Sequence, residues 1–246
     1  MDIRALVTGA DHGVGLALAE TLLEQGGRVF AGRYNPRETA LDELSRRYPD
    51  RLTTVSLDIG SDDSVREAAE TVEKLTGRLD LLINNAGILG DTEATIREGK
   101  MDFEEMLKVY NVNTLGALRV TKAFLSLLLK GEARMIANIS SEAGSIGQNK
   151  RSGWFAYCMS KAALNMQSSL VFNGIKEAGG RVLVIHPGWV RTYMRGELDA
   201  AADLTPAESA ENIISLIRER MRRSAEGARN GEQPEYIDAY GAPLPW

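Results

Sequence analysis

Short apolar runs alternate along this chain with segments of helical periodicity, and this alternation constrains the fold more than any other feature. Buried-strand patterns occupy 3–7, 28–32, 52–57, 79–83, 135–139 and 182–186, with a further strand expected near Tyr236. Helical spacing predicts helices at 14–25, 37–48, 61–76, 102–129, 155–177 and 206–222. Strands alternating with helices form βαβ units. We therefore expect an α/β fold, a doubly wound parallel sheet of about seven strands with helices on both faces.

Length and composition favour one soluble domain, which we expect to span residues 1–246. The chain is 43% hydrophobic and 26% charged, with no repeat or Pro/Ser-rich linker. We find no run of about eighteen apolar residues that predicts a membrane span, and a strand pattern starting near residue 3 leaves no room for a signal peptide. A single cysteine, Cys158, excludes an internal disulfide and favours a reducing cytoplasm.

The charge pattern argues against nucleic acid as the main partner. The formal net charge is -5, and no basic stripe is present. Residues 218–223 are locally basic but alternate with Glu219 and apolar residues, so we interpret them as a solvated helix face.

The turn at residues 8–15 is the first candidate binding element. Parallel sheets of this kind bind ligands beyond the carboxyl ends of their strands, and this turn joins the first strand to the first helix. Its three glycines permit a tight turn and a close approach to a pyrophosphate, which the helix N-terminus stabilises. The spacing differs from the usual G-x-G-x-x-G, and any tight βα turn favours glycine. Three glycines together with Thr8 nevertheless favour nucleotide binding.

Three further groups of residues follow later strands. Asn-Asn-Ala-Gly at 84–87 ends the fourth strand, Ser140 and Ser141 end the fifth, and Pro-Gly at 187–188 ends the sixth. Each group alone is ordinary turn chemistry. Their placement at one edge of one sheet indicates a shared site.

Tyr157 and Lys161 are four residues apart on an expected helix and so lie on one face of it. A cation beside a phenol favours the phenolate, which would lower the tyrosine pKa from about 10 toward neutrality. Such a phenol suits a general acid that protonates an alkoxide. A solvated helix pair has the same spacing, so the interpretation depends on the strand-end motifs.

Taken together, these motifs resemble the short-chain dehydrogenases/reductases. The matching features are Thr-Gly-x-x-x-Gly-x-Gly at 8–15, Asn-Asn-Ala-Gly at 84–87, Asn113, Ser141, Tyr-x-x-x-Lys at 157–161 and Pro-Gly-x-Val-x-Thr at 187–192. The finer texture, including the terminal Leu-Pro-Trp, is similar to the C-factor and sniffer-type carbonyl reductase branch. The resemblance implies a single Rossmann-type domain whose cofactor site is formed by Thr8, Gly9, His12, Gly13, Val14, Gly15, Arg33, Asp58, Ile59, Asn85, Ala86, Gly87, Tyr157, Lys161, Pro187, Gly188, Val190 and Thr192.

The resemblance also implies catalytic roles. Tyr157 would donate a proton to a substrate carbonyl that receives hydride from a nicotinamide, and Lys161 would lower the Tyr157 pKa and bind the nicotinamide ribose. Ser141 would hold and polarise the carbonyl oxygen, and Asn113 would anchor a water. Asn111 and Ser140 are the neighbouring alternatives. We choose Asn113 because its spacing to a following glycine fits the family, and Ser141 because it directly precedes the residue before Ala-Gly.

Cofactor choice depends on the end of the second strand. NAD-specific sites place an acid there, whereas this chain has Arg33 and no acid until Glu38. A guanidinium can bind a 2′-phosphate with charge-assisted hydrogen bonds, so we expect NADP(H) to be favoured over NAD(H). Carbonyl reductase relatives tend to carry the arginine one position later, where this chain has Tyr34. Asp58 resembles the acid that contacts the adenine.

Other chemistry finds little support. His12, His186 and Cys158 give no zinc-ligand spacing, so we expect no metal. Specificity should lie in 148–154, where Trp154 lines the mouth or simply packs, and in a lid at 193–204. Glu142 either disfavours anionic substrates or is merely solvated. Trp246 either folds back over the substrate side or joins a subunit interface, and a homo-oligomer is possible.

Two hypotheses follow. The first is an NADPH-dependent oxidoreductase that reduces a small ketone or aldehyde. The alternative is a catalytically weak nucleotide-binding signalling or scaffold protein of the C-factor type. An intact set of Asn113, Ser141, Tyr157 and Lys161 favours the enzyme.

Overall fold

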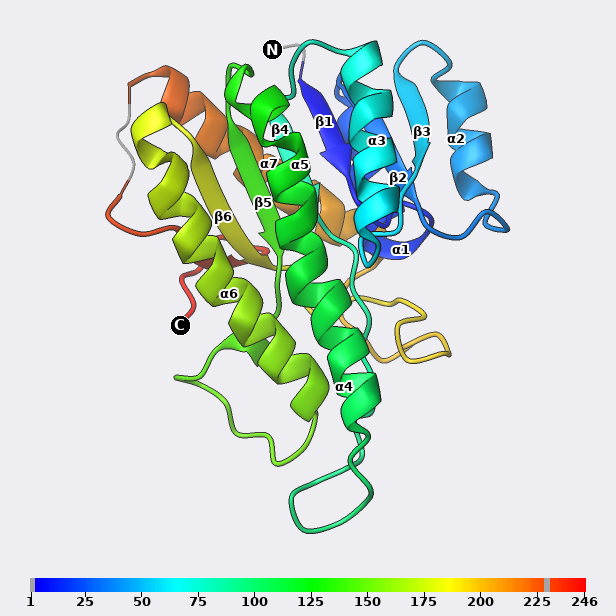
Figure 1. The fold of residues 1–246 in the computed structure, drawn as a ribbon, viewed down its shortest axis with the longest axis vertical. Coiled ribbons are helices and arrows are strands. Elements are labelled where there is room, and N and C mark those ends of the chain that lie inside the picture. Colours follow the sequence, from blue (N-terminus) through cyan, green and yellow to red (C-terminus); the bar gives the residue numbers. More distant parts are fainter. Residues whose placement is uncertain (1–2, 228–230) are drawn as a thin grey trace.

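In the computed structural model, which describes residues 3–227 and 231–246, the described residues form one parallel sheet in the order β3-β2-β1-β4-β5-β6-β7 (Figure 1). The order reverses at β1, which pairs with β2 on one side and β4 on the other. This arrangement confirms the predicted doubly wound fold. In such folds a ligand-binding crevice lies at the carboxyl ends of the strands where the strand order reverses, which here is beside β1. The strands are β1 (Arg4–Val7), β2 (Arg28–Arg33), β3 (Leu52–Ser56), β4 (Leu81–Asn84), β5 (Met135–Ile139), β6 (Arg181–His186) and β7 (Glu235–Asp238).

Helices cover both faces of the sheet. They are α1 (Gly13–Glu24), α2 (Ala40–Arg47), α3 (Asp62–Leu75), α4 (Phe103–Tyr110), α5 (Ala117–Leu129), α6 (Phe155–Ile175) and α7 (Pro206–Ala225). Figure 1 shows α3, α5 and α6 in front of the strands, with α1 and α7 behind them.

Two apolar cores result from the alternation of side chains along each strand. In β1, Ala5 and Val7 belong to the core beneath α1, α2 and α7, whereas Leu6 belongs to the core beneath α3, α5 and α6. All three are fully buried. Burying a leucine-sized side chain contributes about 1.5–3 kcal/mol. Both cores therefore stabilise the sheet and hold the carboxyl ends of its strands in position.

Side chains cap several helix starts, including those of α3 and α7. Ser61 caps α3, accepting a hydrogen bond from the Ser64 amide at 3.3 Å, as its position in the sequence suggests. Thr205 and Glu208 form a reciprocal capping box at α7. The α2 helix begins later than predicted, because Asn35 precedes a proline and its side chain accepts the Arg37 amide in a turn.

The expected helix at 102–129 is interrupted. Its two α-helical parts, α4 and α5, are joined by a π-helical segment at Asn111–Gly116. Sequence periodicity does not reveal such a bulge, which widens the helix locally and frequently marks a functional site. Asn113 lies within it.

Together, α4, the π-helical segment and α5 form a helical stretch, Phe103–Leu129, that is long and apolar enough by length and composition to cross a membrane. The expectation that the chain has no such segment is therefore wrong by that criterion. Half of the most apolar stretch of this helix is buried inside the fold, and Val120 and Phe124 are fully buried in the core. It is a core helix of this domain.

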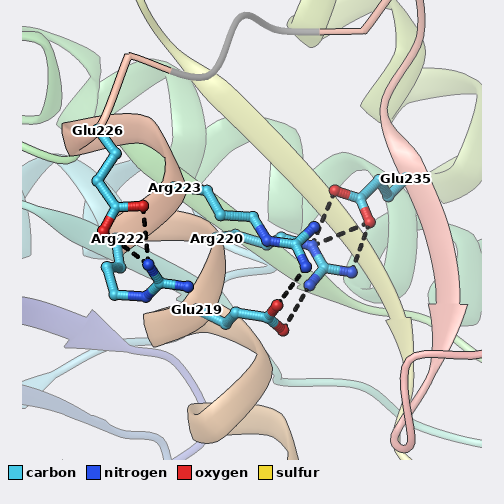
Figure 2. Close-up of polar contacts among 6 residues, drawn as sticks. All are labelled: Glu219, Arg220, Arg222, Arg223, Glu226 and Glu235. Atoms are coloured by element: carbon cyan, nitrogen blue, oxygen red, sulfur yellow. Dashed lines mark hydrogen bonds and ion pairs between the residues drawn. The ribbon is translucent and has the colours of Figure 1, made fainter.

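An ion-pair network joins the end of α7 to β7 (Figure 2). Arg220 binds Glu235 at 2.9 Å and Glu219 at 2.8 Å, while Arg223 also contacts Glu219, and Arg222 binds Glu226 at 2.6 Å. The prediction of a solvated face holds for Arg222 and Arg223 but is wrong for Arg220, whose side chain is only 14% exposed. Each of these arginine charges is neutralised locally.

Candidate active site

The first strand end is tied to the fourth through Thr8 and Asn85. The Thr8 hydroxyl accepts the backbone amides of Asn85 and Ala86, both at 3.0 Å. In return, the Asn85 side chain donates to the carbonyls of Thr8 and Gly9. Gly9 has a φ of +61°, and a Cβ there would lie 2.9 Å from the Ala86 Cα. The threonine and the glycine therefore hold two strand ends in close contact, as the strand-end argument anticipates.

The N-terminus of α1 faces the crevice with free donors. Gly15 sits so close beneath the turn that a Cβ would lie 2.0 Å from the Gly9 carbonyl oxygen. His12, the N-cap, is exposed, and within the described residues no side chain caps this end. Val14 follows in the first turn. These unpaired amides and the helix dipole suit a pyrophosphate.

Thr192 lies across from this turn. A Cβ on Gly13, where φ is +57°, would stand 3.5 Å from the Thr192 methyl group. The structure thus brings the first and last of the predicted cofactor motifs together. In the segment that leads to Thr192, the Pro187 carbonyl accepts the Ser209 hydroxyl at 2.7 Å. Gly188 adopts a φ of +86°, and Val190 forms a β-bridge with Leu204.

Asp11 is a residue that the sequence reasoning missed. Its buried carboxylate accepts the backbone amides of Tyr34 at 2.9 Å and Asn35 at 3.3 Å. It therefore fastens the segment after β2 to the glycine turn. Its position in the sequence could have revealed this role. A carboxylate within a proposed phosphate-binding turn would repel phosphate, so it needs hydrogen-bond donors of the protein as partners.

Arg33 reaches the edge of the same crevice. One guanidinium nitrogen binds Asp42 at 2.6 Å, and the side chain is 17% exposed. Its Nε atom is buried without a partner among the described residues. An unpaired buried donor is costly, so Arg33 has unused capacity for an anion. Asp42, the residue that already binds it, was not anticipated.

Asp58 and Ile59 occupy the end of β3. The Asp58 carboxylate accepts the Gly60 amide at 2.8 Å, and Ile59 packs against Gly116 of the π-helical segment. The Asn111 side chain donates to the Gly60 carbonyl at 3.0 Å. Asn111, the alternative to Asn113, therefore supports this loop.

Asn113 instead points toward the segment after β4. Its side chain donates to the Ile88 carbonyl at 2.8 Å and the Ser160 hydroxyl at 3.0 Å, and accepts the Ile88 amide at 2.8 Å. A Cβ on Gly87 would lie 3.2 Å from the Asn113 oxygen and 3.7 Å from the Lys161 nitrogen. Asn113 thus fixes the backbone beside Lys161. Ser160 was missed, although it adjoins Lys161 in sequence.

Ser141 lies beside Tyr157. Its hydroxyl oxygen accepts the Ala143 amide at 3.2 Å. The Ser141 side chain favours the charged form of the phenol and so acts to lower the pKa of Tyr157. Ser140 turns away and donates to the Asn165 side chain at 2.7 Å. Of the two serines, Ser141 is the one placed to contact a group bound at the tyrosine.

Lys161 is buried next to Tyr157 but does not have the expected electrostatic effect. Its ammonium donates to the Ile139 carbonyl at 2.8 Å and lies 5.6 Å from the centre of the Tyr157 ring. Burial lowers the pKa of Lys161 to about 8. Burial raises the pKa of Tyr157 to about 12, although the Ser141 side chain acts to lower it. The expected shift of Tyr157 toward neutrality is wrong for this structure, because loss of solvation outweighs every stabilising contact.

Trp154 packs beside Tyr157. Its ring meets Tyr157 edge-on at 6.2 Å, and the guanidinium carbons of Arg151 and Arg195 each lie 5.2 Å from its centre. Arg151 also forms a bidentate pair with Glu142, at 2.6 and 2.9 Å. Glu142 is therefore a neutralised partner. Trp154 connects the two segments predicted to determine specificity.

Metal chemistry has no set of ligands in the described part of the chain, where no group of three His, Cys, Asp or Glu residues could hold an ion. His186 ends β6 beside the site, and burial lowers its pKa. Its Nδ1 atom has no partner among residues 3–227 and 231–246. Cys158 is half-buried, and burial raises its pKa, so its thiol is poorly disposed to react.

Comparison with known proteins agrees with this geometry. The family model for short chain dehydrogenases matches residues 4–221. The C-signal protein of Myxococcus xanthus is 35% identical over 171 residues, covering 70% of this chain and 95% of that protein. The NADPH-bound carbonyl reductase from chicken fatty liver superposes with a TM-score of 0.85 at 31% identity, covering 100% of both chains. Carbonyl reductase Sniffer of D. melanogaster gives 0.85 at 26% identity, again covering 100% of both.

The matched region contains the carboxyl ends of strands β1 to β6, the glycine turn and the helix that carries Tyr157 and Lys161. The residues present also fit a dinucleotide, through the uncapped α1 N-terminus and the unpaired Arg33 donor among the described residues. The chain belongs to the short-chain dehydrogenase/reductase family and is a carbonyl reductase-like, NAD(P)-dependent oxidoreductase.

Proposed function

We propose that this protein uses NADPH to reduce a small ketone or aldehyde to the alcohol. The observation that carries the proposal is the position of the buried Tyr157 ring, whose centre lies 5.6 Å from the ammonium of the buried Lys161 at the carboxyl edge of the sheet. Bound NADPH would supply a hydride from its nicotinamide. Oxidation of the alcohol would be the reverse reaction at the same site.

Residues of this chain supply the rest of the chemistry. Ser141 orients the carbonyl oxygen toward the phenol. Tyr157 is protonated at neutral pH, since its pKa is raised to about 12, and it donates this proton to the oxygen as the carbonyl is reduced. Lys161 stabilises the resulting phenolate through its ammonium group. Asn113 keeps the backbone at Gly87 and Ile88 in place, and we propose that it also anchors the water that returns the proton.

Arg33 supports preferential binding of NADPH, because it would bind the 2′-phosphate that NADH lacks. The α1 N-terminus would bind the pyrophosphate, which both cofactors carry. The chicken fatty liver carbonyl reductase, which aligns over its full length, carries NADPH. Asp58 and Ile59 would border the adenine, and Ala86 and Gly87 would leave space for the nicotinamide half.

The remaining proposals concern context. A lone cysteine favours a reducing cytoplasm. Exposed apolar side chains on α4, α5 and α6, which include Leu107, Leu118, Met166 and Leu170, suit a homo-oligomer. We propose a small carbonyl compound as the partner at the active site, with no nucleic acid or membrane involved.

A signalling or scaffolding role is the second candidate, and similarity to the C-signal protein favours it. Purified wild-type protein should oxidise NADPH with members of a panel of aliphatic and aromatic aldehydes and ketones. Tyr157→Phe should abolish this turnover while NADPH still binds, as measured by the cofactor fluorescence. If wild type binds NADPH but turns over no carbonyl in the panel, the second candidate replaces the first.

A further inference from the structure

The last residues of the chain fold back along β7. The Asp238 carboxylate accepts the amides of Tyr240 and Ala242, both at 2.9 Å, and Gly241 adopts the left-handed φ of +86° that closes the turn. Beyond it, the Leu244 amide donates to the Tyr236 carbonyl at 2.8 Å. The C-terminal segment is therefore returned toward the carboxyl edge of the sheet.

There it meets the segment that follows Ser141. A backbone oxygen of Trp246 accepts the Gly147 amide at 3.0 Å. The indole ring of Trp246 packs on the ring of Tyr236, with centres 5.2 Å apart. A Cβ on Gly147 would lie 3.3 Å from Pro245. The terminal tryptophan thus contacts its own chain at two points, on the ring of Tyr236 and at the Gly147 amide.

Tyr236 completes the connection to the active site. Its hydroxyl donates to the Ser141 carbonyl at 2.6 Å, and the whole side chain is buried. The Gly144 amide donates to the same carbonyl at 2.9 Å. Both lone pairs of that oxygen are therefore used, which fixes the peptide plane of Ser141. Burial raises the pKa of Tyr236 to about 12, so the hydroxyl remains a donor across the working pH range.

We propose that Tyr236, held by Trp246, is a positioning residue that keeps Ser141 against Tyr157. The inference rests on the proposed reductase function for its kinetic consequences. Its structural content, that the C-terminal residues restrain the turn at 141–147, stands independently. Among the contacts on the Ser141 carbonyl, the Tyr236 hydroxyl is the one that comes from an element remote in sequence.

The kinetic consequence follows from geometry. A small misplacement of a catalytic group costs as much as about a hundredfold in rate. Without the Tyr236 hydroxyl, the Ser141 peptide retains the Gly144 contact but can rotate about it. Ser141 would then orient the carbonyl less well, and its lowering effect on the pKa of Tyr157 would weaken.

The test compares Tyr236→Phe with Tyr240→Phe, a matched removal of a hydroxyl from an exposed ring four residues away. We expect kcat to fall about tenfold in Tyr236→Phe, with an unchanged NADPH dissociation constant. Tyr240→Phe should match wild type in both. An unchanged kcat in a folded Tyr236→Phe would overturn the proposal.

Amide hydrogen exchange over 141–147 provides a readout that needs no activity. Trp246→Ala should speed exchange at Gly147 and Gly144, and Trp246→Phe should restore most of the protection. Faster exchange in Trp246→Ala combined with an inactive wild type would support the restraint of the turn at 141–147 by the C-terminal residues and reject the reductase function. Exchange in Trp246→Ala identical to that of wild type would reject this restraint, whatever the activity. If Tyr236→Phe fails to fold, the comparison of Trp246→Ala with Trp246→Phe tests the proposal.

Discussion

The ammonium of Lys161 lies 5.6 Å from the centre of the Tyr157 ring and is hydrogen-bonded to the Ile139 carbonyl. Both side chains are buried, and burial moves their pKa values in opposite directions, to about 8 for Lys161 and about 12 for Tyr157. Each therefore carries a proton at neutral pH. The pair is a proton donor beside a cation that can stabilise the donor once it is deprotonated.

This relationship predicts a pH dependence of stability. The pKa of Lys161 in the fold, about 8, is below its ordinary 10.5. The unfolded chain binds more protons in that interval, so the contribution of Lys161 to the unfolding free energy rises with pH from about 8 to 10.5. Urea unfolding at about pH 7.5 and about pH 9.5 should show wild type gaining stability relative to Lys161→Met. Equal differences at both values would contradict the buried, easily deprotonated lysine.

Tyr157 should act in the opposite sense at higher pH. Its pKa in the fold, about 12, exceeds the ordinary 10.0, so the folded state holds a proton that the unfolded chain releases. The contribution of Tyr157 to stability is therefore lost as pH rises from about 10 to 12. Tyr157→Phe should unfold less steeply with pH in that interval, as followed by circular dichroism. A slope equal to that of wild type would show that the phenol is solvated.

Arg33 should discriminate between the two cofactors. Replacing it in Arg33→Asp puts a carboxylate where the 2′-phosphate is proposed to bind, so the dissociation constant for NADPH should rise about a hundredfold and that for NADH by much less. Arg46→Asp, an exposed charge reversal on α2, is the matched control and should change neither. Equal losses for both cofactors in Arg33→Asp would remove Arg33 from the phosphate site.

Asp42 should weaken the same site. It binds the Arg33 guanidinium at 2.6 Å and so competes with an incoming phosphate. Asp42→Asn keeps the size of the side chain and removes its charge. We expect NADPH to bind a few-fold more tightly and NADH to bind as before, as titrated by protein fluorescence. Weaker NADPH binding in this variant would mean that Asp42 orients Arg33 for the cofactor.

The exposed apolar side chains of α6 should support self-association. Met166 and Leu170 are 64% and 66% exposed, one turn apart on the helix. Light scattering should find an oligomer for wild type and a smaller species for Met166→Glu. Ile96→Glu, at an apolar side chain exposed in the loop between β4 and α4, should leave the mass unchanged. A wild-type monomer would reject this surface as an interface.

Sequence reasoning succeeded where the information was local. Apolar periodicity predicted the strands and helices, and the strand-end motifs could be placed because parallel strands share one carboxyl edge. It failed where contacts join remote residues: the Asp42 contact with Arg33 and the Tyr236 contact with Ser141 leave no local pattern. The π-helical segment around Asn113 was also invisible, since one added residue per turn barely alters apolar spacing.

The pKa of Tyr157 shows a different limit. Spacing correctly placed Lys161 on the same helix face, but the pKa depends on burial and on where the ammonium points. Neither can be read from a four-residue interval. The same holds for Glu142, whose charge is neutralised by Arg151, a residue further along the same β5–α6 connection.

Transfer of deuterium from NADPH labelled at its nicotinamide C4 tests the central claim most directly. With wild type and a responsive carbonyl substrate, mass spectrometry should find the label on the alcohol carbon. Tyr157→Phe, shown to bind NADPH with wild-type affinity, should yield almost no labelled alcohol. Label transfer by Tyr157→Phe at the wild-type rate would contradict the assignment of Tyr157 as the proton donor.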